Sequence, residues 1–405
     1  MIKGCIRALF TKSALVGVSK DRFTRLLLQR MSLCAFGRDL IPYDPPDYAC
    51  HLKHLPKYKI KLAQSPTPIH KWNIPGVPDE YTISIKRDDM TGSTLSGNKV
   101  RKLEFLFADA LERGCSHVIT CGGIQSNHCR ATAVAATQLG LKVHLVLRAD
   151  IKDVSEVSCQ GNLLMNRLCG ADMYFVPRGA PYETQLKPRM EIIAQQIKKD
   201  TGEDTYHIPV GGSNTLGMFG YLDAFTELLS QGVADNFDDI VFACGSGGTA
   251  AGLCIANYLT GSKLKIHALI VCDSAQYYHG HINEVLRDVG LNDVTSEEIV
   301  DVIEGHKGQG YAVSQQFELD YLRDVAVGTG IMLDPVYTGK AVLGLTQELR
   351  TNTSRFKGQR ILYIHTGGVF GLYDGRIDNT LKQTDSVTNK LHMWMDINSP
   401  PSDSK

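Results

Sequence analysis

The sequence predicts an α/β protein built on open parallel sheets. Short apolar runs rich in β-branched residues alternate along the chain with longer segments of helical periodicity. Strands that alternate with helices favour parallel pairing. Several of the expected strands end in glycine-rich loops, and open parallel sheets bind ligands at that end of their strands. We therefore expect one ligand site, lined by loops that lie far apart in the sequence.

Length and composition limit the class of protein. The 405 residues are enough for two domains, and a formal net charge of 0 gives no reason to expect a nucleic-acid partner. No apolar run approaches the roughly 18–20 residues of a membrane span. The histidines do not pair with cysteines or acids at ligand spacing. We expect neither a membrane segment nor a metal site.

The first 40 residues differ in composition from the rest of the chain. They contain eight lysines and arginines against Asp21 and Asp39, with apolar residues interspersed at helical spacing. This composition is typical of a mitochondrial transit segment, and a basic tail is the alternative. A start at Met31 would leave a cytoplasmic form. We expect a mitochondrial protein with residues 1–40 as its transit segment.

The expected elements of the first half begin after a proline-rich lead-in, residues 41–80, which we expect to wrap a domain. Alternating residues predict a strand at 81–87. Apolar residues on one face predict a helix at 103–113, stopped by Gly114. A βαβ unit follows, with a strand, an Ala-rich helix and a second strand at residues 117–121, 126–139 and 142–147.

The same pattern recurs in the second half. A strand, a glycine-rich loop, a helix and another strand are expected at residues 239–243, 245–249, 250–259 and 265–271. A late strand at 361–364 opens into a His-Thr-Gly-Gly loop at 365–368. We expect disorder in the last residues, 398–405. The expected strands therefore place several polar loops at one edge of a sheet.

Lys99 is the first candidate catalytic residue. It follows a Gly-Asn turn at the mouth of a strongly amphipathic helix. The positive end of a helix disfavours a second positive charge, so we expect a lowered pKa for this amine. A neutral amine forms a Schiff base with a carbonyl compound. Lys99 is therefore a candidate for carrying an aldehyde cofactor.

The loop at 245–249 is a candidate phosphate site. A strand leads into it and a helix leaves it, so several backbone N–H groups point at one spot and the helix dipole adds attraction. It has neither a Walker lysine nor the spacing of a dinucleotide site, which favours a phosphate monoester. A tight turn without a ligand is the alternative. The five loop residues are Gly245, Ser246, Gly247, Gly248 and Thr249.

Three other loops offer polar groups where strands end. The segment 122–128 reads Gly-Gly-Ile-Gln-Ser-Asn-His, and Ser126 or Asn127 could each be a helix N-cap. Three polar residues in a row exceed what one cap requires, and free N–H groups there would suit a substrate carboxylate. Tyr337 follows an Asp-Pro-Val turn, and Thr366 lies in the loop after the late strand.

Together these loops resemble the pyridoxal-phosphate family of D-cysteine desulfhydrases and aminocyclopropane-carboxylate deaminases. The segments that carry the resemblance are, in order, residues 96–104, 122–128, 245–249, 334–340 and 365–368. The resemblance implies the tryptophan-synthase-β-like fold (fold type II) with two open parallel-sheet domains, usually in a homodimer. It also implies a large cofactor-binding domain, a small inserted domain and a tail, here residues 41–101 with 216–390, 102–215 and 391–405.

The resemblance implies a role for each motif at the cofactor, pyridoxal 5'-phosphate. Lys99 would carry it as a Schiff base, and the 245–249 loop would bind its phosphate with help from Lys102. Asn127 would contact its phenolic oxygen. The ring nitrogen would meet a hydroxyl, supplied by Thr338 or Thr366.

The substrate is a small amino acid in this family. Its carboxylate is implied to lie at the start of the helix after residue 125, near Gln125, Ser126, Asn127 and His128. Tyr337 matches a family active-site tyrosine, and Tyr311, in a Gly-Gln-Gly-Tyr segment, matches a second. Ser126 and the two tyrosines are therefore candidates for moving a proton.

The residue after Tyr337 separates the two activities of the family. The deaminases carry a glutamate there that contacts the ring nitrogen, whereas this chain has Thr338. A carboxylate keeps the nitrogen protonated and makes the ring a strong electron sink, and a threonine brings no charge. Opening a cyclopropane needs the strong sink. Elimination of a thiolate needs less, because the leaving group removes the developing charge.

The sequence therefore predicts β-elimination of D-cysteine to pyruvate, hydrogen sulfide and ammonia, with the D preference inherited from the resemblance. Several alternatives stay open. They are an aminocyclopropane-carboxylate deaminase, a related D-amino-acid eliminase, a cofactor-binding protein without turnover, and a racemase. A racemase needs acid–base groups on both faces of Cα, which Lys99 and Ser126 could supply.

Overall fold

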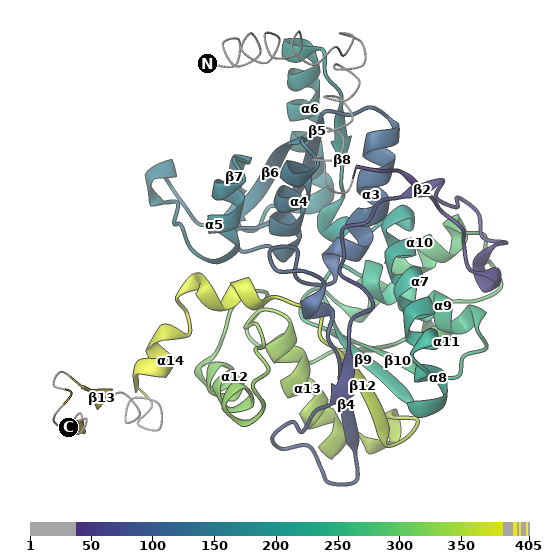
Figure 1. Cartoon of the computed structure of the whole chain (residues 1–405), viewed down its shortest axis with the longest axis vertical. Helices are drawn as coiled ribbons and strands as arrows, with labels where there is room; N and C mark the ends of the chain where they lie inside the picture. Colours follow the sequence, from purple (N-terminus) through teal and green to yellow (C-terminus); the bar gives the residue numbers. More distant parts are fainter. Residues whose placement is uncertain (1–37, 384–391, 395–396, 398–401, 404–405) are drawn as a thin grey trace, which may run out of the picture.

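Two open sheets organise the part of the chain that the computed structural model describes, residues 38–383, 392–394, 397 and 402–403 (Figure 1). The larger sheet lies in the lower half of the view and the smaller sheet in the upper half. The predicted α/β class with two open, largely parallel sheets is confirmed. The predicted transit segment lies outside the described residues, apart from residues 38–40.

The larger sheet has the strand order β11-β10-β9-β12-β4-β3, in which β3 alone runs antiparallel to its neighbour. Because β12 pairs in parallel with β4 on one side and β9 on the other, the loops that follow these three strands lie side by side at one edge of the sheet. The strands are β3 (Ile69–Lys71), β4 (Thr82–Lys86), β9 (Asp239–Cys244), β10 (Lys265–Ile270), β11 (Asp301–Ile303) and β12 (Arg360–Ile364).

Helices cover both faces of the larger sheet, because alternate strand residues point to opposite faces. On one face, Ile240 and Phe242 of β9 pack against α7, α9 and α10. On the other, Val241 and Ala243 pack against α12 and α13. The helices are α7 (Thr215–Ser230), α9 (Gly248–Leu259), α10 (Ala275–Asp288), α12 (Gln316–Thr329) and α13 (Thr338–Thr351), with the shorter α8 (Val233–Asn236), α11 (Ser296–Ile299) and α14 (Asp378–Gln383) around them.

The smaller sheet is fully parallel, with the order β7-β6-β5-β8. The βαβ unit expected from residue 117 to 147 is present as β5, α4 and β6. Val118 and Ile119 point to opposite faces, toward α4 and toward α6. The elements are β5 (His117–Gly123), α4 (Asn127–Gln138), β6 (Lys142–Ala149), α5 (Gly161–Leu168), β7 (Asp172–Pro177), α6 (Lys187–Thr201) and β8 (Thr205–His207).

Helix α3 (Lys99–Glu112) connects the two sheets, and it begins four residues earlier than predicted. The apolar periodicity starts at Leu103, whereas Arg101 and Lys102 are buried by polar partners and so broke the expected pattern. Arg101 is held by Asp88 at 2.8 Å and Glu227 at 3.0 Å. Hydrophobic periodicity assigns charged residues to the solvent-exposed face of a helix, so it misses a charged residue that is buried in an ion pair.

The termini add two short antiparallel ribbons. The proline-rich lead-in forms β1 (Ile41–Pro42), paired with β2 (Tyr58–Lys59). At the other end β13 (His392–Met393) pairs with β14 (Ser402–Asp403), so the predicted disorder is wrong for residues 402–403. Residues 398–401 and 404–405 lie outside the described part.

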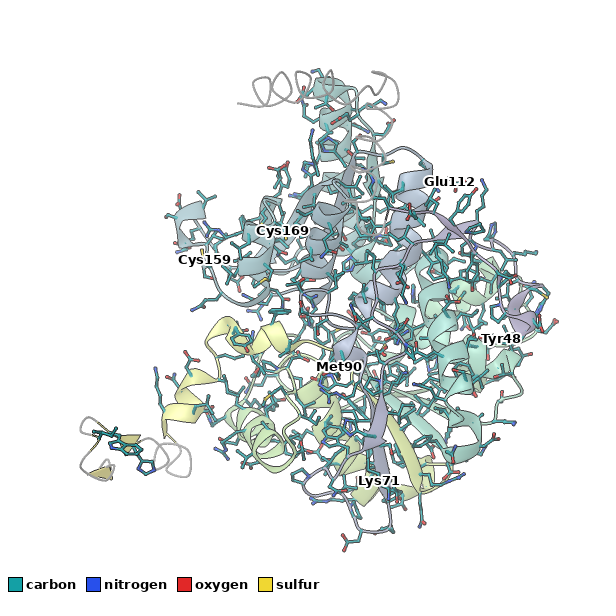
Figure 2. All side chains as sticks on the ribbon, in the orientation of Figure 1. Tyr48, Lys71, Met90, Glu112, Cys159 and Cys169 are labelled. Atoms are coloured by element: carbon teal, nitrogen blue, oxygen red, sulfur yellow. The ribbon has the colours of Figure 1, made fainter. Side chains whose placement is uncertain are left out.

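Side chains fill the space between helices and sheets (Figure 2). Within the described residues, no helix combines the length and apolar character that a membrane crossing requires. The division into residues 41–101 with 216–390 and residues 102–215 stays a prediction.

Candidate active site

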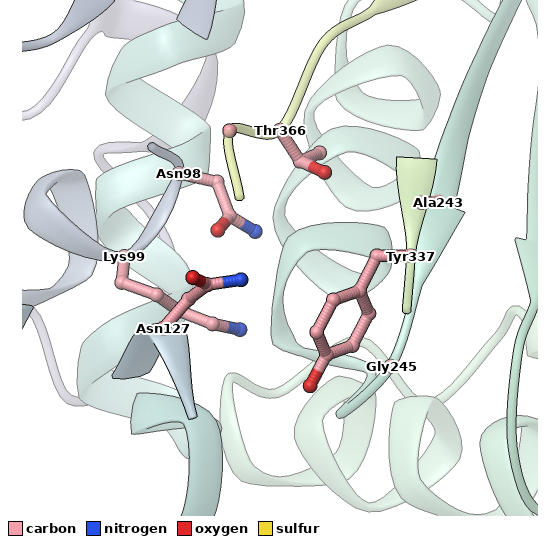
Figure 3. A pocket seen from close by; sticks show the side chains of 8 residues that line it. Asn98, Lys99, Asn127, Ala243, Gly245, Tyr337 and Thr366 are labelled. Carbon is pink, nitrogen blue, oxygen red and sulfur yellow. The ribbon is translucent and has the colours of Figure 1, made fainter. Parts of the chain in front are cut away.

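A cavity lies where the start of α3 meets strand ends and loops that follow strands of both sheets (Figure 3). Lys99 and Asn127 lie on one side of it, and Tyr337 lies opposite them. Strand-end loops of both sheets therefore meet here, as the sequence predicted. The lining residues are Asn98, Lys99, Asn127, Ala243, Gly245, Tyr337, Thr366 and Gly367.

Lys99 is the first residue of α3, and its Nζ donates to Ser246 Oγ at 3.4 Å. Burial lowers the pKa of this amine to about 8, so the predicted direction is confirmed and desolvation is the main cause. The turn before it is fixed by Asn98 N–H donating to Thr366 O at 3.0 Å. A Cβ at Gly97 would lie 2.9 Å from that same oxygen, and φ there is +109°, so glycine is required.

The loop at 245–249, the predicted phosphate cradle, lies at the start of α9. Gly247 has a φ of +84°, and a Cβ at Gly248 would lie 2.8 Å from Lys102 Nζ. The Lys102 amine is buried and donates to Gly211 O and Ser213 Oγ, both at 3.3 Å. Burial, and then the nearby Lys99 charge, hold its pKa well below the ordinary lysine value. A buried amine at the start of a helix fits a phosphate dianion.

The tyrosines predicted from motifs lie together. Tyr311 and Tyr337 place their hydroxyl oxygens 2.6 Å apart, with the rings edge to face. Burial raises the pKa of Tyr311 to about 12 and that of Tyr337 well above its usual value. The close approach of Tyr337 to the phosphate loop requires Gly245, because a Cβ there would lie 2.6 Å from Tyr337 Cε1.

The Tyr311 loop is anchored to the helix that follows Tyr337. Lys340 Nζ donates to the carbonyl oxygens of Lys307 at 2.7 Å, Gly310 at 3.0 Å and Val313 at 2.7 Å. A single buried ammonium therefore fixes the loop that carries Tyr311 relative to the helix that follows Tyr337.

The start of α4 differs in part from prediction. Ser126 is its N-cap, with Oγ accepting from Cys129 N–H at 3.2 Å, and it does not line the cavity. His128 is buried, and its ring is hydrogen-bonded to Thr120 Oγ1 at 2.9 Å. The Gln125 amide accepts from Asn162 N–H at 2.8 Å and donates to Gln160 O at 3.1 Å. The Gln125 and His128 side chains therefore have protein partners and lie outside the cavity lining, whereas Asn127 lines the cavity, and the predicted substrate contacts stay a prediction.

A lysine amine beside a phosphate cradle is the arrangement that pyridoxal phosphate requires. The family model described as pyridoxal-phosphate dependent enzyme matches residues 60–367. The chain is a pyridoxal-phosphate-dependent enzyme.

Relatives refine this assignment. The enzyme is 45% identical over 338 residues to a bifunctional D-cysteine desulfhydrase/1-aminocyclopropane-1-carboxylate deaminase, mitochondrial, from Arabidopsis thaliana, with 82% of this chain and 84% of that protein covered. It is 33% identical to a D-cysteine desulfhydrase from Salmonella choleraesuis, over 80% of this chain and 98% of the other. The predicted family is therefore confirmed.

Solved structures agree. A crystal structure of an ACC deaminase homologue matches with a TM-score of 0.71 and 32% identity, covering 84% of this chain and 99% of that one. An O-acetylserine-dependent cystathionine β-synthase from Helicobacter pylori shares the fold, with a TM-score of 0.56 and 19% identity over 76% and 94% of the two chains. These neighbours confirm the predicted fold of this enzyme class.

Of the two threonines predicted for the ring nitrogen, Thr366 lines the cavity and Thr338 does not. Thr338 is completely buried, its hydroxyl donates to Asp334 Oδ1 at 2.7 Å, and it accepts from Asp334 N–H at 2.8 Å. The single proton of that hydroxyl and one of its two lone pairs are therefore used by Asp334. The cavity lining therefore favours Thr366 over Thr338 as the hydroxyl for the ring nitrogen, and that contact stays a prediction.

Two residues near the phosphate cradle were missed from sequence. Ser213 Oγ accepts from Gly248 N–H at 3.1 Å and donates to Ser246 Oγ at 2.8 Å. His281 of α10 packs on Gly247, and burial lowers its pKa to about 4. Ser213 had a signal, because it follows two glycines, whereas His281 is brought in only by helix packing. Within the described residues, no three His, Cys, Asp or Glu side chains form a group that could hold a metal ion.

Proposed function

We propose that this enzyme is a lyase that splits D-cysteine and water into pyruvate, hydrogen sulfide and ammonia. The observation that carries the proposal is the absence of Asp and Glu from the eight residues that line the cavity, among which Thr366 would supply a hydroxyl to the ring nitrogen. An uncharged partner makes the ring a weaker electron sink. Such a sink suffices when a thiolate leaves with the electron pair.

The residues of the cavity fit the cofactor. Lys99 would attach it, and the 245–249 loop with Lys102 would hold its phosphate. Pyridoxal phosphate, when bound, withdraws electrons from Cα and so acidifies the proton there. Asn127 would donate to its phenolic oxygen.

Proton transfer falls to groups that face each other across the cavity (Figure 3). With a pKa of about 8, the Lys99 amine is partly neutral at physiological pH and can remove the Cα proton. The sulfur that leaves from Cβ needs a proton, which Tyr337 can donate while Tyr311 supports its hydroxyl.

Assaying D-cysteine and L-cysteine side by side tests the proposal, with pyruvate and sulfide as the measured products. We expect faster turnover of D-cysteine, with equal amounts of the two products. Faster turnover of L-cysteine would overturn the substrate assignment. The appearance of the opposite enantiomer without pyruvate would indicate a racemase, and no turnover at all a binding protein.

Aminocyclopropane-carboxylate deamination is the second candidate, favoured by the bifunctional name of the Arabidopsis relative. Release of 2-oxobutanoate and ammonia from 1-aminocyclopropane-1-carboxylate measures it. The uncharged lining predicts that this rate is well below the rate with D-cysteine.

We further propose a mitochondrial homodimer. The basic composition of residues 1–40 and the mitochondrial name of the Arabidopsis relative support the location. A fusion of residues 1–40 to a fluorescent reporter tests it, and a diffuse cytoplasmic signal would favour a start at Met31. Light scattering of the purified enzyme measures the oligomeric state.

A further inference from the structure

Asn162, near the start of α5, lies directly behind the cavity residue Asn127. Its side chain is completely buried. Its Nδ2 donates to Asn127 Oδ1 at 2.9 Å and to Gln125 O at 3.0 Å, and its Oδ1 accepts from Arg130 Nε at 3.2 Å. One amide therefore connects a buried guanidinium to a residue that lines the cavity.

The orientation of this amide is determined by its neighbours. Arg130 can only donate hydrogen bonds, so the oxygen of Asn162 must face it. The carbonyl of Gln125 can only accept, so the nitrogen of Asn162 must face that side. Exchanging the two atoms of the Asn162 amide would break both contacts.

The orientation of the Asn127 amide is fixed by its hydrogen bond with Asn162. Because Asn162 presents N–H to it, Asn127 must turn Oδ1 toward Asn162, which leaves Nδ2 directed into the cavity. Figure 3 shows this arrangement, with the Asn127 amide nitrogen on the side of the cavity and its oxygen on the far side. The cavity therefore receives a hydrogen-bond donor from this residue and not an acceptor.

Arg130 is an unusual anchor because no carboxylate among the described residues pairs with it. It is 1% exposed, donates to Thr94 O at 2.6 Å and Ser96 O at 2.7 Å, and stacks 5.0 Å from the Phe370 ring. Burial lowers its pKa to about 10, so it remains a donor at neutral pH.

The carbonyl of Ser96 lies three residues before Lys99, in the turn that leads into α3. The same guanidinium therefore fixes the segment that carries the cofactor lysine and the amide that orients Asn127. Burying an arginine without a counterion is costly, and these fixed contacts offset that cost.

We propose that Asn162 is a positioning residue that, held by Arg130, aims the Asn127 N–H at the phenolic oxygen of the cofactor. The inference rests on the proposed contact of Asn127. A donor at that oxygen stabilises its anionic form and so lowers the pKa at which the Lys99-bound cofactor loses its proton. A wrongly turned Asn127 would present an oxygen and raise that pKa.

Asn162→Asp tests the proposal in the holoenzyme without substrate. The carboxylate keeps a partner in Arg130 but cannot donate, so Asn127 must turn its N–H away from the cavity. We expect the pH midpoint of the visible absorbance of the bound cofactor to rise by about 1 unit, the equivalent of one charge-assisted hydrogen bond. Asn127→Ala should raise the midpoint as well, and Asn162→Asp should add nothing in that background.

Asn166→Leu, compared with Asn162→Leu, is the matched control. Asn166 lies one turn further along α5, is equally buried, and its amide makes no hydrogen bond within the described residues. We expect only Asn162→Leu to shift the midpoint. An unshifted midpoint in Asn162→Asp, or additive shifts with Asn127→Ala, would overturn the proposal. The titration needs no turnover, so failure of the proposed reaction is detected separately, by the product assay.

Discussion

The hydroxyl oxygens of Tyr311 and Tyr337 lie 2.6 Å apart although the residues are 26 positions apart in the chain. Tyr337 lines the cavity, and the Tyr311 ring contacts the Tyr337 ring edge to face. Because one hydroxyl donates to the other, a proton given up by Tyr337 can be replaced from Tyr311. We therefore propose the pair as a two-member proton source that lies opposite the Lys99 amine.

For the tyrosine pair, we expect Tyr337→Phe to lower kcat for sulfide release by roughly 10²- to 10⁴-fold, the usual contribution of a general acid. Tyr311→Phe should cost about tenfold, because Tyr337 loses one hydrogen bond but keeps its proton. Tyr321→Phe is the control, since this tyrosine is bonded to Thr346 and lies outside the cavity lining. Full activity in Tyr337→Phe would assign the acid to another group.

For Lys99, we expect the rate at which the apoenzyme attaches pyridoxal phosphate to rise with pH and level off above about 8, the lowered pKa of its amine. The reason is that only the neutral amine attacks the aldehyde. The growth of visible absorbance after mixing, recorded at several pH values, measures it. Lys99→Ala should yield no adduct that borohydride traps, and a trapped adduct in that variant would contradict the assignment. A rate that still rises at pH 10 would contradict the role of burial.

For Lys102, we expect Lys102→Met to weaken pyridoxal-phosphate binding by about 10- to 100-fold, the worth of one hydrogen bond to a charged group. Binding of pyridoxal, which lacks the phosphate, should be unaffected. Fluorescence titration of the apoenzyme measures both affinities. Equal losses for the two compounds would indicate general disruption of the cavity.

Although Lys102→Met should weaken cofactor binding, we expect it to stabilise the apoenzyme at neutral pH. The pKa of Lys102 is lowered in the folded state, so at neutral pH the unfolded chain binds more protons at this residue than the folded chain does. Stability of the wild-type apoenzyme should therefore rise with pH from the folded pKa up to the ordinary lysine value. Lys102→Met removes this term. Its unfolding temperature should be higher at pH 7 and change less toward pH 10, as calorimetry would show.

For the two threonines, we expect replacement by valine to have different effects: lower activity for Thr366 and lower stability for Thr338. Thr366→Val removes the cavity hydroxyl that we propose as the partner of the cofactor ring, and it should lower kcat by about tenfold with little change in stability. Thr338→Val leaves the buried Asp334 carboxylate without one donor, which should destabilise the fold by about 1–3 kcal/mol. Unfolding temperature and kcat, measured for both variants, separate the roles. The visible absorbance of the bound cofactor is a third measurement. An equal change of that absorbance in both variants would indicate that Thr338 also contacts the cofactor ring.

Much of the site was predictable because its signals are local. Gly-rich loops directly after apolar strands, a lysine after a Gly-Asn turn, and a tyrosine before a helix are properties of short segments. The start of α3 was predicted four residues too late because its signal is not local. Its first turn carries Arg101 and Lys102, whose burial depends on partners elsewhere in the chain.

The sequence by itself determined the class of fold and predicted a cofactor lysine and a phosphate loop, because each follows from residue types that are adjacent in the chain. Only the tertiary structure decided that Thr366 and not Thr338 faces the cavity, that Gln125 turns to α5, and that Asn162 orients Asn127. A hydroxyl or amide can donate or accept in many directions. Which direction it takes depends on partners from distant segments that folding brings within hydrogen-bonding distance.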